Sequence, residues 1–114
     1  MHEYSIVQAL IEQCETLAQE NQATEISKVV IKVGVLSGVE PDLLATAFAT
    51  FKETSPVCQR AELFMDIQPV LVQCKHCHAK NTLQQHVYVC LNCQSEDISI
   101  LDGEEMFLMQ LEMT

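Results

Sequence analysis

The sequence has few basic residues, no long apolar run and no low-complexity tract. Only 6 lysine and arginine residues stand against 16 aspartate and glutamate residues, which gives a formal net charge of −10. Because proteins bind nucleic acid through clustered lysine and arginine, this balance argues against nucleic acid as a partner. It suits a basic protein or a divalent cation better, although acidic side chains also serve solubility alone.

Two further absences concern the membrane. No stretch approaches the roughly 20 apolar residues of a membrane-spanning helix, and the chain start lacks the basic region and apolar run of a signal peptide. We therefore expect a cytoplasmic protein with no membrane association. Hydrophobic residues nevertheless make up 48% of the 114 residues, which supports a buried core and argues against disorder.

Hydrophobic periodicity predicts two helices and three strands. Apolar residues recur at helical spacing in two segments and alternate in the others, while Ser5 and Gln8 match a capping box near the chain start. The expected elements are a helix over 4–21, a strand over 26–36, a helix from Pro41 to just before Ser55, a strand over 61–67 and a strand over 104–113. These predict an α+β fold in which two helices cover one face of a three-stranded mixed sheet.

The composition changes at about residue 71. The stretch from Gln73 to Ser95 has few aliphatic residues and many cysteine, histidine, glutamine and asparagine residues. We predict an α/β domain formed by residues 1–70 with 103–114. A zinc-ribbon domain over 71–102 is inserted between its second and third strands.

Four of the six cysteines form two CxxC pairs separated by twelve residues: Cys74, Cys77, Cys90 and Cys93. Each pair makes a tight turn whose two sulfurs converge, and four thiolates complete the tetrahedron of a structural Zn²⁺ site. A module this small lacks the core to fold alone, so zinc would supply folding free energy on the order of 10 kcal/mol. Iron in a four-cysteine centre and a pair of redox dithiols are the alternatives. A catalytic zinc is disfavoured because no coordination position stays open.

The remaining cysteines and the histidines near the pairs are harder to interpret. Cys14 lies on the apolar stripe of the first helix and is expected to be a small buried hydrophobe. Cys58 has no partner by spacing and receives no role. His76, His78 and His86 are expected at the surface or hydrogen-bonded near the thiolates, and exchange with a cysteine or pH sensing is the alternative.

The first three residues, Met1, His2 and Glu3, offer a compact set of nitrogen ligands. If Met1 is retained, they present an α-amine with a pKa of about 7.7–8, two amide nitrogens and an imidazole. Nitrogen-rich square-planar sets suit Ni²⁺ and Cu²⁺. Glu3, and Glu40 where the fold brings it near, would supply carboxylate oxygens or orient the imidazole. A histidine at the second position is also common in proteins that bind no metal there, so chemistry alone favours an ordinary chain terminus over a metal site.

Three features taken together resemble one family. MHEYS at the start, the segment VVIKVGVLSGVEPDLLATAF and CxxC-x12-CxxC in the last third are similar to the HypA/HybF family of nickel-incorporation accessory proteins. The resemblance extends over nearly the whole chain. It implies a metallochaperone rather than an enzyme, with transferable Ni²⁺ bound at Met1, His2 and Glu3, with Glu40 nearby. It also implies structural Zn²⁺ on Cys74, Cys77, Cys90 and Cys93.

The resemblance further implies partners. It points to the maturation GTPase HypB and the hydrogenase large subunit, with urease accessory proteins as a second set in some bacteria, and to a monomer or weak homodimer. The alternative is a zinc-ribbon module that binds protein or nucleic acid, in which the terminal histidine is incidental. The acidic charge opposes the nucleic-acid form of that alternative.

Overall fold

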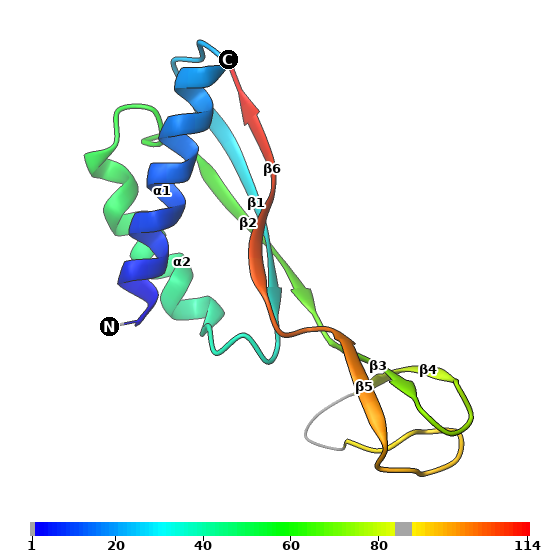
Figure 1. Ribbon diagram of the computed structural model, residues 1–114. Helices are drawn as coiled ribbons and strands as arrows, with labels where there is room; N and C mark the ends of the chain where they lie inside the picture. The colour runs from blue at the N-terminus through cyan, green and yellow to red at the C-terminus, as the bar shows by residue number, and fades with distance from the viewer. Residues whose placement is uncertain (1, 84–87) are drawn as a thin grey trace.

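The structure is a computed structural model that describes residues 2–83 and 88–114. Its elements are α1 (His2–Glu20), β1 (Ile26–Gly34), α2 (Pro41–Phe51), the short 3₁₀ helix η1 (Lys52–Thr54), β2 (Glu62–Gln68), β3 (Val70–Cys74), β4 (Lys80–Leu83), β5 (Ile98–Asp102) and β6 (Met106–Met113). The molecule is elongated, with extents of 53 × 28 × 16 Å, and the second sheet lies at one end of it (Figure 1).

The first sheet has the strand order β2-β1-β6 and is covered by both helices on one face (Figure 1). β1 runs parallel to β2 and antiparallel to β6. The parallel pair follows from the crossover through α2, because two parallel neighbours need a long connection between them. The predicted three-stranded mixed sheet with two helices on one face is confirmed.

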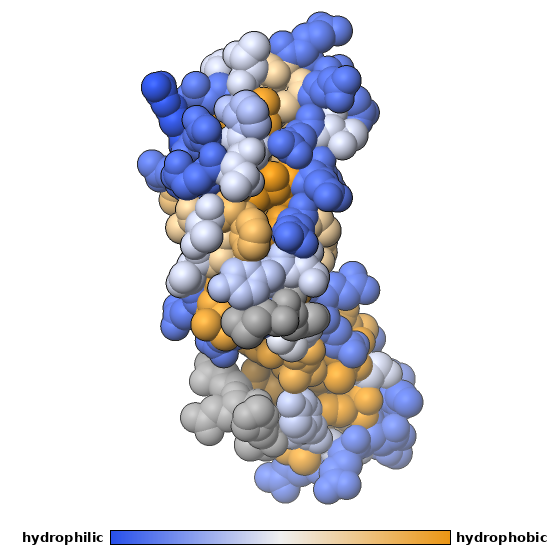
Figure 2. Space-filling view, turned by 90° about the vertical axis from the view of Figure 1, so that its left-hand side faces the viewer, coloured by the Kyte–Doolittle hydropathy of each residue, from blue (hydrophilic) through white to orange (hydrophobic). Residues whose placement is uncertain are grey.

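The core lies between this sheet and the helices. Every second residue of β1 is buried (Val29, Ile31, Val33), and the buried faces of the helices meet them (Val7, Leu10, Ile11, Cys14 and Ala18 from α1; Leu44, Ala47 and Phe48 from α2). Each fully buried valine or isoleucine contributes about 1.5–3 kcal/mol relative to an exposed one. Seen from the helical side (Figure 2), hydrophilic residues flank the upper part of the molecule and hydrophobic residues show between them.

The opposite face of the first sheet carries two lysines over aromatic rings. Lys28 Nζ lies 4.9 Å from the centre of the Phe64 ring, and Lys32 Nζ lies 5.5 Å from that of Phe107. Both rings are nearly half exposed. The two ammonium groups therefore make cation–π contacts with aromatic surface on this face.

The second sheet has the order β4-β3-β5 with antiparallel pairing throughout. Among the described residues, its buried aliphatic cluster comprises Val70, Val72 and Leu83, with Leu36 and Ile98 packed against it. Sequence analysis missed these three strands because each has only four or five residues, which is too short to show a clear alternating pattern, although β3 and β5 each contain three aliphatic residues. They begin at Val70 and end at Asp102, and the division of the chain into two domains at these points stays a prediction.

The first helix begins earlier than predicted. α1 starts at His2, so Ser5 lies within the first turn of the helix and not at the capping position of the predicted capping box. A tertiary contact accounts for the extra residues, because the Glu3 carboxylate accepts a hydrogen bond from the Glu40 backbone N–H at 3.4 Å. Packing of this kind stabilises helix termini more than local propensity does.

Backbone contacts and one ion pair join the two sheets. Leu36 N donates to Gly103 O at 2.8 Å and Gly34 N to Glu105 O at 2.9 Å, where β1 ends beside the link from β5 to β6. Lys32 Nζ on β1 lies 2.6 Å from Asp102 Oδ2 on β5. The lysine, with the Gly103 backbone N–H, lowers the pKa of Asp102 below its usual value.

We expect Asp102→Asn to lower the urea midpoint by an amount that stays constant between about pH 6 and pH 8. A lowered carboxyl pKa stabilises the fold above the ordinary aspartate pKa of about 4, and this contribution fades only as the pH falls through the lowered value. Circular dichroism at several pH values measures it. Glu25→Gln is the control, because its pair with Arg60 is 4.0 Å long and the arginine is 82% exposed. Equal losses in both variants would contradict the prediction.

Candidate metal centres

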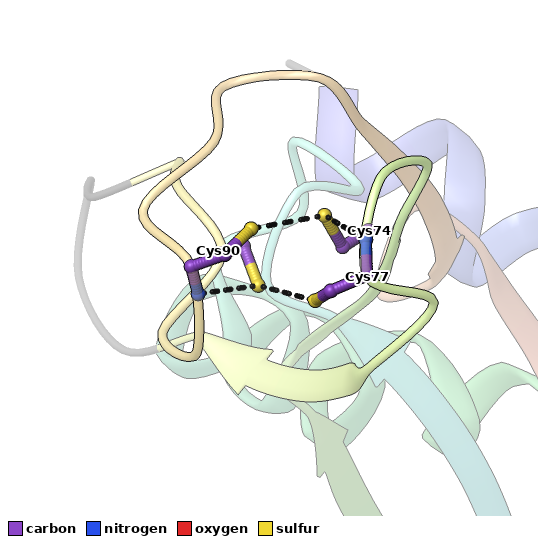
Figure 3. A group of neighbouring side chains, drawn as sticks. Cys74, Cys77 and Cys90 are labelled. Carbon is purple, nitrogen blue, oxygen red and sulfur yellow. Dashed lines mark hydrogen bonds between the residues drawn. The ribbon is translucent and has the colours of Figure 1, made fainter.

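The four cysteines of the two CxxC pairs meet in one cluster. All four Sγ atoms lie within 4.8 Å of one another, with Cys74 and Cys93 3.5 Å apart and Cys77 and Cys90 3.6 Å apart (Figure 3). Four thiolates at the usual Zn–S length of about 2.3 Å would lie about 3.8 Å from one another. The cluster therefore fits a tetrahedral Zn²⁺ ion, and all four positions are supplied by the protein.

Both CxxC pairs use the same backbone turn. In the first, the N–H groups of His76 and Cys77 donate to Cys74 Sγ at 3.3 and 3.4 Å. The second repeats this with Asn92 and Cys93 donating to Cys90 Sγ, both at 3.4 Å. The repeat explains why the spacing alone predicted convergence, because a local turn fixes each pair of sulfurs.

The residue that follows each pair has a left-handed backbone. His78 has φ 64° and Gln94 has φ 66°. Their N–H groups donate to the carbonyls of Cys74 and Cys90 at 3.1 and 2.8 Å, which closes each turn. Such a conformation costs a residue other than glycine roughly 1–2 kcal/mol, so both turns store some strain.

The hydrogen bonds prepare two sulfurs to ionise. The Cys93 backbone N–H, with that of Asn92, lowers the pKa of Cys90 to about 6. The backbone N–H groups of Cys77 and His76 likewise lower the pKa of Cys74. The Ser95 backbone favours the Cys93 thiolate, but hydrogen bonds to the neighbouring cysteine sulfurs and burial together raise its pKa to about 12. Thiolates are the species that bind zinc, so a metal must displace the remaining protons.

Two asparagines that sequence reasoning did not single out lie next to the cluster. Asn81 Nδ2 lies 3.5 Å from Cys90 Sγ, and Asn92 Nδ2 lies 3.5 Å from Cys77 Sγ. Amide donors of this kind stabilise metal-bound thiolates. Asn92 lies inside the second CxxC, and this position is the one feature of the sequence that could have indicated its contact with the cluster.

The histidines take other positions. His76 Nε2 lies 3.5 Å from Asp97 Oδ2, and its side chain is 66% exposed. His78 is exposed and shapes the turn through its backbone. His86 lies outside the described residues. Among the histidines that the structure describes with their side chains, none joins the four-cysteine cluster.

The predicted nickel ligands lie at the start of α1 and next to the start of α2. Glu3 is only 8% exposed, and its carboxylate meets the backbone of Glu40 across 37 residues of sequence. Glu40 is the residue that precedes the first turn of α2, and its side chain is exposed. The Glu40 backbone therefore lies beside the Glu3 carboxylate, and a role for the Glu40 carboxylate at a nickel site stays a prediction. Met1 and the side chain of His2 lie outside what the structure describes.

A family model described as "Hydrogenase/urease nickel incorporation, metallochaperone, hypA" matches residues 1–113. The chain belongs to the HypA family. It is 55% identical to the hydrogenase maturation factor HypA of Shewanella oneidensis over 113 residues, which span 99% of this chain and 95% of the relative. It is 42% identical to the HypA of Campylobacter jejuni, with 99% of both chains covered.

Solved structures of HypA proteins resemble this fold. The solution structure titled "HypA protein" has a TM-score of 0.76 and 41% identity, and the match covers 100% of this chain and 97% of that one. The Ni metallochaperone HypA from Helicobacter pylori has a TM-score of 0.69 and 39% identity, with 97% and 96% covered. The HypA protein of Shewanella oneidensis is described as a hydrogenase maturation factor. Within the described part of the chain, no helix is long and apolar enough to cross a bilayer.

Proposed function

We propose that this protein binds Ni²⁺ at its amino terminus and delivers it during maturation of [NiFe] hydrogenase. The ligands are the Met1 α-amine, the His2 imidazole and neighbouring amide nitrogens, with Glu3 and Glu40 supplying negative charge. Zn²⁺ is held structurally by the four clustered cysteines. The hydrogen bond from the Glu40 backbone N–H to the Glu3 carboxylate supports the proposal, because it places Glu40 beside the start of α1 in a chain that matches a nickel-incorporation family model.

The backbone at the start of α1 supports this ligand set. The first N–H groups of an α-helix have no acceptor within the helix, and α1 begins at His2. The His2 amide can therefore lose its proton to a metal without breaking a helical hydrogen bond. A helix N-terminus by itself repels cations, and the acidic side chain of Glu3 in the first turn of α1 offsets that effect.

Proton competition makes such a site reversible. The amine and the imidazole must be deprotonated to bind, and their ordinary pKa values of about 7.7–8 and 6.5 lie close to neutral pH. Nickel affinity should therefore rise with pH, and a partner that offers a better ligand set can remove the ion. The partners we propose are HypB and the hydrogenase large subunit, in the cytoplasm, with urease accessory proteins as a second set.

We expect His2→Ala to weaken Ni²⁺ binding at least about 100-fold, since loss of a direct ligand exceeds the 10–100-fold cost of losing a supporting group. Titration calorimetry on untagged, zinc-loaded protein measures this. His76→Ala is the matched control, because that exposed histidine faces Asp97 at the other end of the molecule. Zinc content should stay unchanged in both variants.

Two further variants test the other ligands. A short extension ahead of Met1 removes the free α-amine and should weaken binding as strongly as His2→Ala does. Glu3→Gln keeps an acceptor for the Glu40 N–H and removes the charge, so a smaller loss is expected. If native protein, His2→Ala and the extended chain bind Ni²⁺ equally, the proposal is wrong and the zinc-ribbon interaction module becomes the better interpretation.

A further inference from the structure

α1 lies beside β6 (Figure 1), and a groove runs between them. It consists of two hollows of about 480 and 320 Å³, which share Gln13 of α1 and Leu108 of β6 in their lining. Ile6 lines the first hollow and Asn21 lines the second. This α1–β6 groove therefore extends along most of the helix and of the strand.

Both walls of the α1–β6 groove are largely apolar. On the helix, Ile6, Leu10 and Leu17 recur at helical spacing and share one side of α1. On the strand, three of the five methionines of the chain line the groove: Met106, Met109 and Met113. Methionine side chains adapt their shape to different neighbours. The groove can therefore receive apolar side chains of varied shape.

The groove follows the free edge of β6 and not one face of the sheet. Successive residues of a strand point to opposite faces, yet Met106, Phe107 and Leu108 all line the first hollow. β6 is an outer strand in the order β2-β1-β6, so within the described residues one side of its backbone has no neighbouring strand. β6 also lacks the lysine and proline residues that often protect such edges. An extended chain in the groove can therefore reach the backbone of β6.

The edge of β6 is interrupted near its middle. The register with β1 shifts between Val30 and Ile31, and Met109 has no partner across this pair of strands. Such a shift bends the strand and limits regular pairing to short runs on either side of it. A segment bound at this edge is held by few backbone hydrogen bonds, so its side chains in the two hollows must supply much of the affinity.

Acidic residues stand at both ends of the groove. Glu104 lines the first hollow and the exposed Glu105 follows it, while the exposed Glu20 precedes Asn21 at the other end. Neither α1 nor the segment 104–113 contains a lysine or an arginine. Complementary charge favours the encounter of two partners and suppresses wrong ones. The groove therefore suits a segment with basic residues on both sides of an apolar stretch.

The same charges disfavour a second copy of the chain as the occupant. An antiparallel pair of β6 strands would bring Glu105 of each copy near Glu112 of the other, and each copy carries a net charge of −10. Like charges placed in this way oppose association. A basic partner meets no such repulsion.

We propose that the α1–β6 groove binds an extended, basic segment of a partner protein, which adds as a strand to the edge of β6. Apolar side chains at alternate positions of the segment enter the two hollows on either side of Gln13, and lysine or arginine at its ends faces Glu104 and Glu20. Main-chain hydrogen bonds to β6 set its register. The inference is independent of the nickel proposal, because it uses neither the chain start nor the four clustered cysteines.

The test combines the full zinc-loaded chain with a fluorescently labelled peptide, KVTVQVTVK, in which valine alternates with polar residues between two lysines. We expect saturable binding by fluorescence anisotropy, and slower amide hydrogen exchange in β6 but not in β2. Ala9→Arg puts a positive side chain into the first hollow, so affinity should fall at least about tenfold. Gln19→Arg is the matched control, because that exposed residue of α1 lines neither hollow and should leave affinity nearly unchanged.

Two further peptides separate charge from strand pairing. EVTVQVTVE reverses the charge, and KVTVPVTVK places at its centre a proline that cannot donate to a strand; both should bind at least about tenfold more weakly. The proposal is overturned if KVTVQVTVK does not bind, if Ala9→Arg binds it as tightly as the native chain does, or if exchange in β6 is unchanged in the complex. Sedimentation of the chain alone tests the other occupant, since a dimer that Ala9→Arg dissociates would assign the groove to a second copy.

Discussion

Replacing Cys90 by serine is expected to leave the protein without bound zinc and to unfold the second sheet while the first sheet persists. Cys90 Sγ accepts hydrogen bonds from the backbone N–H groups of Asn92 and Cys93 and from the side-chain amide of Asn81. One substitution therefore removes a zinc ligand together with the acceptor of these three hydrogen bonds. In small zinc modules the metal contributes about 10–16 kcal/mol to folding. The few buried aliphatic side chains of the second sheet cannot replace that amount.

Metal analysis and amide hydrogen exchange measure this outcome. Zinc content should fall from one per chain to none, and protection should be lost over β3, β4 and β5 but kept in β1. A chelator added to the native protein should reproduce the pattern. Cys14→Ala is the control, since that cysteine lies in the main core and should leave zinc content unchanged. Retention of zinc by Cys90→Ser, or loss of protection in β1, would contradict the prediction.

The second large effect is expected where β1 meets the link between the sheets. A Cβ atom on Gly34 would lie 2.3 Å from Gly103 O and 2.4 Å from Gly103 C. Both are backbone atoms, so the two chain segments must separate and the hydrogen bond from Leu36 N to Gly103 O is strained or lost. We expect Gly34→Ala to lower the free energy of unfolding by about 3 kcal/mol or more.

Gly38→Ala provides the matched control for this steric argument. Gly38 has φ +80°, so alanine there carries the cost of a left-handed backbone, but no atom lies within 4 Å of its added Cβ. We expect a loss of about 1–2 kcal/mol for this variant. Urea unfolding followed by circular dichroism compares the two. If Gly34→Ala is no less stable than Gly38→Ala, close backbone approach does not limit this junction.

The helices, the three main strands and the clustering of the four cysteines could be predicted because each depends on local chemistry. The helical spacing of Val7, Leu10 and Cys14 marks a buried face wherever that face finds its partner. A CxxC turn brings its own two sulfurs together through hydrogen bonds within four residues. Errors arose where local signals were weak or overruled, as in the three short strands beside the cysteines and in the start of α1.

By itself, therefore, the sequence determined which four cysteines cluster, the faces that would be buried and the acidic balance that disfavours nucleic acid. Only the tertiary structure decided which distant groups meet: Glu3 with Glu40, Glu15 with Ser55, and Gly34 with Gly103. The physical reason is that periodicity reports which side of an element is buried but not what packs against it. That choice depends on how α1, α2 and both sheets settle together.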